Sequence, residues 1–171
     1  MEMVEVKDEN IITYSKQYLR KTTFDKLVKI AKKAPAPLVL FEGYRSFEKQ
    51  TEMFNNFKKE HPHLSDEEAN KFIAIPSRAV HITGGAVDVT IQGYDMGTDY
   101  LCFDGSQATD YYISDEVAAN RKLLCDLMAT EDFINFHNEW WHFEYGCSLW
   151  AKKFNDGVPI FDIVKEIENN E

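Results

Sequence analysis

The segment Ala86–Ile91 constrains the fold more than any other part of the sequence, because its side chains alternate in type. Successive side chains of a β-strand point to opposite faces of its sheet, so the branched apolar residues at 87, 89 and 91 share one face and Asp88 lies on the other. If the apolar face is buried against the core, Asp88 faces a cleft. The segment therefore predicts a strand that carries a carboxylate beside a candidate site.

Other segments predict a mixture of helices and strands. In four segments, a Ser or Thr that can cap a helix comes directly before residues with a helical pattern. These segments begin near residues 22–23, 46, 65 and 114. Residues 38–41 and 142–145 have strand-like patterns, whereas residues 75–80 and 92–113 are typical of loops. Helices and strands do not alternate regularly as βαβ units, so the sequence favours an α+β fold.

The length of 171 residues, 44% of them hydrophobic, is sufficient for one domain with a sizeable core. We expect a single domain over residues 1–171. Residues 1–17 are expected to form a lead-in, part of an irregular or extended stretch that reaches residue 21. Residues 152–171 are expected to form a C-terminal tail segment, which ends in a solvated helix over residues 165–171.

Composition excludes several kinds of partner. The net charge of −10 argues against nucleic-acid binding, because affinity for phosphate backbones depends on Lys and Arg. No apolar run approaches the length of a membrane span, and the first residues lack the pattern of a signal peptide. The three cysteines, Cys102, Cys125 and Cys147, form no CxxC pair, which favours reduced thiols. We expect a cytoplasmic protein with a small ligand and without membrane or nucleic-acid partners, while its oligomeric state stays open.

Two histidines and a carboxylate are a common ligand set for a catalytic zinc ion. His81 and Asp88 supply two such ligands, and His142 is a candidate for the third. Glu139 precedes His142 by three residues, separated from it by two tryptophans, and is a candidate general base. The alternative is that His81 lies on the surface, Asp88 ends a strand, and the tryptophans are core residues with ordinary polar neighbours.

Arg45 is a further candidate for the site. It follows a predicted strand and Gly43-Tyr44, and therefore lies at the end of that strand. A guanidinium in this place can stabilise a developing oxyanion or hold a substrate carboxylate. The alternative is an ordinary surface ion pair.

Taken in order, these segments resemble the M15 zinc peptidases. Residues 81–90, HITGGAVDVT, resemble the family motif His-x-x-Gly-x-Ala-x-Asp, and residues 139–143, EWWHF, are similar to its catalytic signature. Gly43-Tyr44-Arg45 resembles the arginine motif of the family. Residues 95–98 and 120–124, Gly146 and residues 149–151 continue the likeness, which runs from about residue 18 to residue 151. Within M15, the D-alanyl-D-alanine dipeptidases, including the vancomycin-resistance type, are the most similar group.

The resemblance implies a fold, a reaction and a role for each site residue. The fold is a small α+β domain with a central, largely antiparallel sheet flanked by helices. His81, Asp88 and His142 would bind one zinc ion, although such ligand sets also accept other divalent metals. Glu139 would act as general acid and base, and Arg45 would stabilise the tetrahedral intermediate. The implied reaction is hydrolysis of D-Ala-D-Ala to two D-alanines, so the implied partner is a small peptide.

The chain departs from the family where the substrate is recognised. The family usually has a serine one or two residues before its first histidine, where this chain has Val80 and Ala79, and the nearest serine is Ser77. Leu101 stands where the family usually has an aspartate for the ammonium group of the substrate.

The candidate substrate contacts are Tyr44, Ser77, Asp99 and Asp104. The departures leave two alternatives to a dipeptidase. One is a D,D- or L,D-carboxypeptidase that acts on longer or N-blocked peptidoglycan peptides. The other is a non-catalytic binder of peptide or metal.

Overall fold

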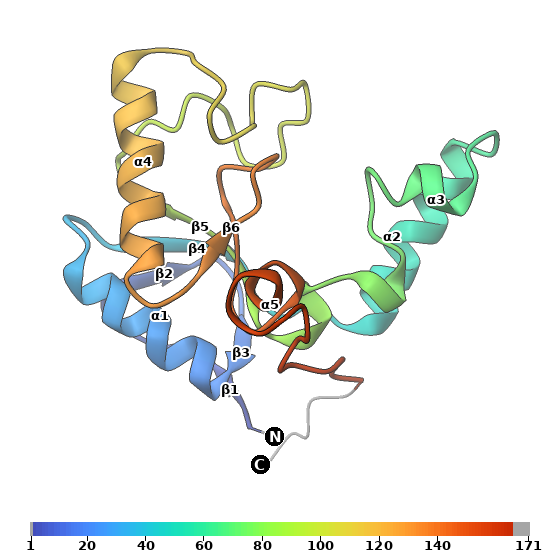
Figure 1. Cartoon of the computed structure of the whole chain (residues 1–171), viewed down its shortest axis with the longest axis horizontal. Helices are drawn as coiled ribbons and strands as arrows, with labels where there is room; N and C mark the ends of the chain where they lie inside the picture. The colour runs from blue at the N-terminus through green and yellow to red at the C-terminus, as the bar shows by residue number, and fades with distance from the viewer. Residues whose placement is uncertain (1, 166–171) are drawn as a thin grey trace.

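A five-stranded sheet lies at the centre of the computed structural model, which describes residues 2–165 (Figure 1). The strand order is β2-β4-β5-β7-β6, and the strands span Ile11–Thr13, Leu38–Glu42, Ala86–Ile91, His142–Glu144 and Ile134–Asn135, respectively. β2 pairs with β4 in parallel, and the other neighbours are antiparallel. The prediction of an α+β fold with a largely antiparallel sheet is confirmed.

The N-terminal segment contributes strands to the fold. β1 (Met3–Glu5) pairs antiparallel with β3 (Tyr18–Arg20) in a separate two-stranded sheet, and β2 forms one edge of the main sheet. The expected extended lead-in is thus divided into three short strands. Strands of three residues are too short for their alternation to be recognised in the sequence.

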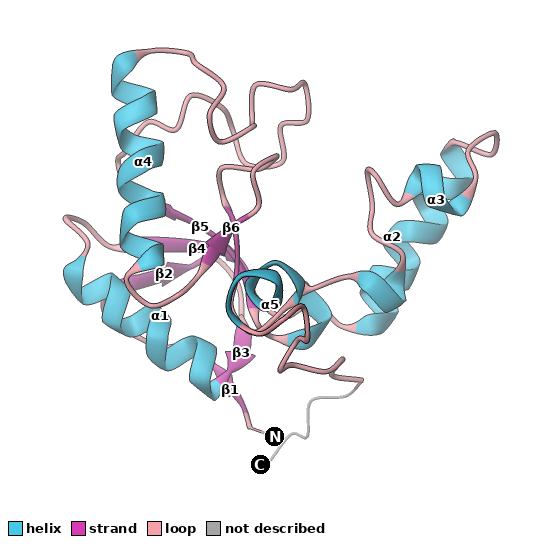
Figure 2. Cartoon of the chain, in the orientation of Figure 1, coloured by secondary structure: helices cyan, strands magenta, loops and turns pink. Residues whose placement is uncertain are grey.

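The helices and the two short 3₁₀ turns lie around the sheet (Figure 2). They are α1 (Lys21–Lys33), α2 (Phe47–Glu60), α3 (Asp66–Ala69), η1 (Pro76–Arg78), η2 (His81–Thr83), α4 (Asp115–Ala129) and α5 (Ser148–Phe154). Ser46, Ser65 and Ser114 cap α2, α3 and α4 as predicted. The prediction that Thr22 or Thr23 caps the first helix is wrong, because the chain passes directly from β3 into α1.

The core lies between the sheet and the helices α1 and α4, which contact each other (Figure 1). The apolar face of β5 contributes Val87, Val89 and Ile91 to this core, whereas Asp88 lies on the opposite face. α2 and α3 form an arm that projects from the other side of the molecule (Figure 1). The predicted division of β5 into a core face and a site face therefore agrees with the structure.

The C-terminal segment packs against η2 and β3. Val164 is buried, and its backbone N–H donates to the carbonyl of Ile82 at 2.8 Å. The Arg20 guanidinium lies 4.4 Å from the centre of the Phe161 ring. Residues 166–171, most of the predicted solvated helix, lie outside the described residues, and Lys165 is exposed.

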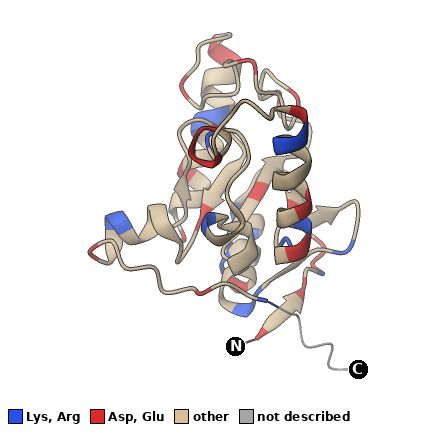
Figure 3. Ribbon diagram, turned by 90° about the vertical axis from the view of Figure 1, so that its right-hand side faces the viewer, with Lys and Arg blue, Asp and Glu red and all other residues tan. Residues whose placement is uncertain are grey.

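Charged residues are distributed over helices, strands and loops (Figure 3), and acidic residues are in excess in the sequence. Among residues 2–165, no helix has the length and apolar character that crossing a membrane requires.

Candidate metal centre

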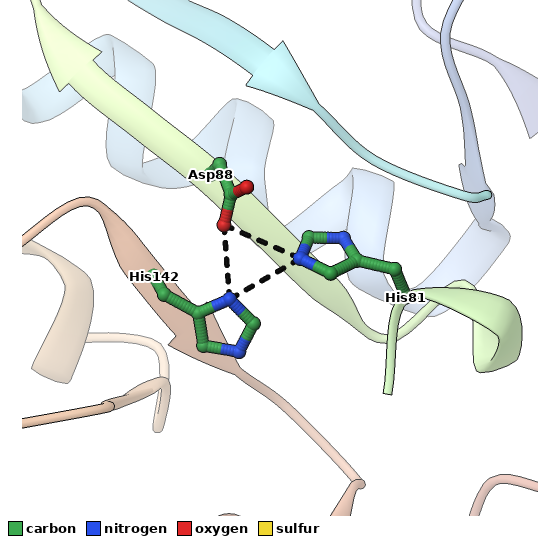
Figure 4. A group of neighbouring side chains, drawn as sticks. All are labelled: His81, Asp88 and His142. Carbon is green, nitrogen blue, oxygen red and sulfur yellow. Dashed lines mark hydrogen bonds and ion pairs between the residues drawn. The ribbon is translucent and has the colours of Figure 1, made fainter. Parts of the chain in front are cut away.

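Three side chains meet on the face of the sheet opposite the core (Figure 4). Antiparallel pairing places Asp88 on β5 directly opposite His142 on β7. His81 comes from η2, which ends at Gly84 with a left-handed φ of 72°, a conformation that glycine adopts without strain. The topology therefore brings together residues that are up to 61 positions apart in sequence.

The three donor atoms form a compact triangle. His142 Nδ1 lies 2.9 Å from Asp88 Oδ1 and 3.2 Å from His81 Nε2. The distance between His81 Nε2 and Asp88 Oδ1 is 3.3 Å. With metal–ligand bonds of about 2.0–2.1 Å, two ligands of a tetrahedral zinc ion are roughly 3.3 Å apart. All three residues are buried. The donor set and its spacing therefore fit one zinc ion with its fourth position open.

Second contacts orient two of these ligands. His81 Nδ1 donates to the Gly43 carbonyl at 2.8 Å, which leaves the lone pair of Nε2 directed at the metal position. Asp88 Oδ2 accepts a hydrogen bond from the Tyr100 hydroxyl at 2.8 Å. Tyr100 was not identified from the sequence, because it lies in a loop and becomes a neighbour of Asp88 only in the folded chain.

The electrostatics of the cluster favour a cation. Burial by itself raises the pKa of Asp88, but His81 and His142 outweigh it and hold that pKa far below its usual range. Burial lowers the pKa of His142, yet the carboxylates of Asp88 and Glu144 raise it to about 10. The two carboxylates therefore favour positive charge at this position, either as a proton on the imidazole or as a bound metal cation.

Glu139 lies at the edge of the cluster, at the start of a turn. The backbone N–H of His142 donates to the backbone carbonyl of Glu139 at 3.3 Å and closes this turn. Burial, followed by repulsion from Asp88, raises the pKa of its carboxyl group, although His142 and His81 partly oppose the shift. Glu139 also lines a cleft of about 510 Å³ between the α2–α3 arm and the loops at residues 103–108 and 136–139. The candidate base is thus half-buried and accessible from the cleft.

The two tryptophans between Glu139 and His142 are core residues. Trp140 and Trp141 are 2% and 0% exposed, and Trp140 Nε1 donates to Thr98 Oγ1 at 2.8 Å. The tryptophans can therefore be core residues while Glu139 and His142 belong to the candidate site, because the turn directs successive side chains to different surroundings.

Arg45 lies beside His81 of the candidate cluster. Its backbone N–H donates to the His81 carbonyl at 3.2 Å. The preceding Gly43 is required here, because a Cβ atom at that position would lie 2.8 Å from the Tyr18 carbonyl oxygen. Close contact between this segment and β3 therefore places the start of the arginine motif against η2.

The Arg45 guanidinium is part of an ordered ion pair. Its Nε and Nη2 donate to the two carboxylate oxygens of Glu42, and its Nη1 donates to Gln50 Oε1 at 2.6 Å. Burial lowers the pKa of Arg45, but Glu42 more than compensates and raises it. Three of the five N–H donors of the guanidinium are used in these contacts, and within residues 2–165 the other two form no hydrogen bond.

The four predicted substrate contacts are dispersed. The Tyr44 hydroxyl donates to the Val164 carbonyl at 3.0 Å, and the Asp104 carboxylate accepts from the Ser106 backbone at 2.9 Å within its own loop. Ser77 in η1 and Asp99 are exposed. These contacts do not join the four residues to the ligand cluster, and their roles in substrate binding stay predictions.

A buried two-histidine, one-carboxylate cluster with a glutamate in an adjoining cleft is the arrangement of a metal-dependent hydrolase. Comparison with known proteins defines the class further. The chain belongs to the M15 peptidase family, since the family model described as D-Ala-D-Ala dipeptidase matches residues 19–159.

Two curated relatives carry different activities in their names. The D-alanyl-D-alanine dipeptidase of Synechocystis sp. is 29% identical over 96 residues, which are 46% of this chain and 39% of the relative. YodJ of Bacillus subtilis, which has the name of a carboxypeptidase, is 27% identical over 161 residues, which are 89% of this chain and 56% of the relative. The chain thus spans about two fifths and just over half of the lengths of these relatives.

Solved structures share the fold at low sequence identity. The LD-carboxypeptidase LdcB has a TM-score of 0.60 and 21% identity, and the match covers 90% of this chain and 72% of that chain. VanYB in complex with D-Ala-D-Ala has a TM-score of 0.53 and 19% identity, and the match covers 92% of this chain and 86% of that chain. These structures place the chain among α+β peptidase folds.

Proposed function

We propose that this protein is a zinc peptidase that hydrolyses the D-Ala-D-Ala bond. The main support is the His81–Asp88–His142 cluster with Glu139 in the adjoining cleft. A zinc ion held there supplies Lewis acidity, which makes water a competent nucleophile near neutral pH.

The residues of the chain have distinct roles in this proposal. Glu139 takes a proton from the attacking water and passes it to the leaving amine. The two remaining N–H donors of Arg45 stabilise negative charge that develops on the carbonyl oxygen. Glu42 and Gln50 hold the guanidinium in one orientation, so little reorganisation is needed when that charge appears.

The test of catalysis is the Glu139→Gln variant, which keeps the size of the side chain and removes the base. We expect the turnover of D-Ala-D-Ala to fall by about 10²–10⁴-fold while zinc content stays at the wild-type level. Retained turnover would eliminate Glu139 as the base. A wild-type, zinc-loaded protein that binds the dipeptide without forming D-alanine would instead be the non-catalytic binder.

A longer or N-blocked peptide is the second candidate substrate, and the cleft favours it. Four phenylalanines, at positions 57, 72, 103 and 136, line about 510 Å³ beside Glu139. Phe72 and Phe103 are 64% and 57% exposed, and Leu101 on the same loop is 53% exposed. Two alanines cannot cover this surface, whereas a peptide extended on the amino side of the scissile bond can.

Product analysis separates the two substrates. Free D-Ala-D-Ala, its N-acetyl form and an N-terminally extended peptide ending in D-Ala-D-Ala would be compared by kcat/KM. Preference for the free dipeptide supports a dipeptidase, and preference for the extended peptide supports a D,D-carboxypeptidase. An L,D-peptide in the same panel tests the remaining carboxypeptidase specificity.

A cytoplasmic location is also proposed, supported by the free thiols of Cys102, Cys125 and Cys147.

A further inference from the structure

Glu144 is a buried carboxylate directly behind one of the metal ligands. It is 4% exposed and follows His142 by two residues on β7, so both side chains lie on the same face of the sheet. The small side chain of Ala86 lies opposite it on β5. Glu144 was not identified as a site residue from the sequence, because an acidic residue at the end of a short strand has no distinctive pattern.

The chemistry of His142 requires a partner at this position. Its Nδ1 faces Asp88 and His81 at 2.9 Å and 3.2 Å and is therefore the atom directed at the metal. A neutral imidazole that binds a metal through Nδ1 carries its proton on Nε2. Glu144 Oε1 lies 3.6 Å from Nε2, and within residues 2–165 this is the one ion-pair contact of that nitrogen.

The other oxygen of Glu144 is anchored separately. Oε2 accepts from the Leu149 backbone N–H at 2.9 Å, and the Ser148 hydroxyl lies 3.4 Å away. These contacts fix the carboxylate from the side remote from the metal ligands. At 3.6 Å the contact with His142 is longer than a hydrogen bond, but its charge still favours a proton on Nε2.

The burial of Glu144 also links it to a cation at this site. A buried carboxylate without a compensating cation is costly. A zinc ion bound through His142 would supply positive charge next to Glu144. The two ligand histidines thus differ, since His81 is oriented by the neutral Gly43 carbonyl and His142 faces a charged carboxylate.

We propose that Glu144 is the positioning residue for His142, and that it sets the zinc affinity of the site by holding the proton of that imidazole on Nε2. The proposal rests on the proposed zinc site and adds to it a residue outside the ligand set. It concerns metal binding, so its test requires no substrate.

The test measures zinc dissociation constants by competition with a chromophoric chelator, for wild type, Glu144→Gln and Glu144→Asp. We expect both variants to bind zinc about 10–100-fold more weakly, as is typical when the partner of a ligand histidine is removed. The d–d absorption spectrum of the Co²⁺-loaded protein should change in both variants, because the geometry of His142 is less constrained. Glu116→Gln on α4 is the matched control, since it makes the same substitution at an exposed carboxylate outside the cluster, and it should bind zinc like wild type.

The melting temperature of each metal-free protein separates positioning from folding. Weaker zinc binding at an unchanged metal-free melting temperature supports the proposal. Wild-type zinc affinity and an unchanged cobalt spectrum in either folded variant would overturn it, while the proposed peptidase function would stand. If the wild-type protein itself fails to bind zinc, both the proposed function and the role of Glu144 are overturned.

Discussion

Replacement of Arg121 by methionine should destabilise the protein strongly, although this residue lies outside the proposed site. Arg121 on α4 is 2% exposed, and its guanidinium donates to four backbone carbonyls in the loop between β5 and α4. The acceptors are the carbonyls of Met96, Ser106, Ala108 and Tyr111, at distances from 2.6 to 3.3 Å. One side chain thus fixes much of the loop that carries Tyr100 to Asp88.

The size of the effect follows from these contacts. Loop carbonyls can return to water when the loop opens, so a net value of about 1 kcal/mol per hydrogen bond applies, or about 4 kcal/mol in all. For a chain of this length, 1 kcal/mol shifts the melting temperature by about 2–4 °C, so the expected decrease is about 8–16 °C.

Thermal unfolding followed by circular dichroism measures the shift. Lys122→Ala is the matched control on the same helix, because Lys122 is exposed and, among residues 2–165, pairs only with Asp126 across one helical turn. We expect the control to change stability by about 0.5 kcal/mol or less. A melting temperature for Arg121→Met within about 3 °C of the wild-type value would refute the reasoning, since the loop would then be held by other contacts.

Three further predictions concern the metal, the guanidinium and the thiols. Zinc at 100 times its dissociation constant should stabilise the chelator-treated protein by about 2.7 kcal/mol, measured as a higher melting temperature that fresh chelator reverses. Arg45→Lys should reduce kcat by about 10²-fold, because lysine cannot reproduce the paired contacts with Glu42. Steady-state kinetics measures this change, and an unaltered kcat would show that Arg45 does not stabilise the oxyanion. Burial raises the pKa of Cys125, helped by Asp126, to about 11 and that of Cys147 to about 12. Iodoacetamide at pH 8 should therefore label Cys102 first, which peptide mass spectrometry can check.

Much of the site was predictable because its residues lie in strong local patterns. Asp88 sits in a six-residue strand with a clear alternation, and the Glu139–His142 spacing stands out beside two tryptophans. The serines at 46, 65 and 114 predicted three helix starts correctly, because capping depends on contacts within one turn.

The unpredicted parts depend on contacts between distant segments. β6 has two residues, and α5 follows β7 after a short turn, so neither leaves a distinctive periodic pattern. Tyr100 and Glu144 gain their relation to the metal ligands through the loop held by Arg121 and through the start of α5. Such relations have no fixed spacing in the sequence.

The sequence by itself indicated metal-dependent hydrolysis, because the residue types that bind a metal and transfer a proton occur in short motifs. Tertiary structure decided how those motifs meet. The pairing of β5 with β7 sets Asp88 opposite His142, and the segment from Gly43 to Arg45 holds η2 so that His81 completes the cluster. The cleft beside Glu139 was also decided at this level, since its walls come from the α2–α3 arm and two separate loops, and only folding fixes the distance between them.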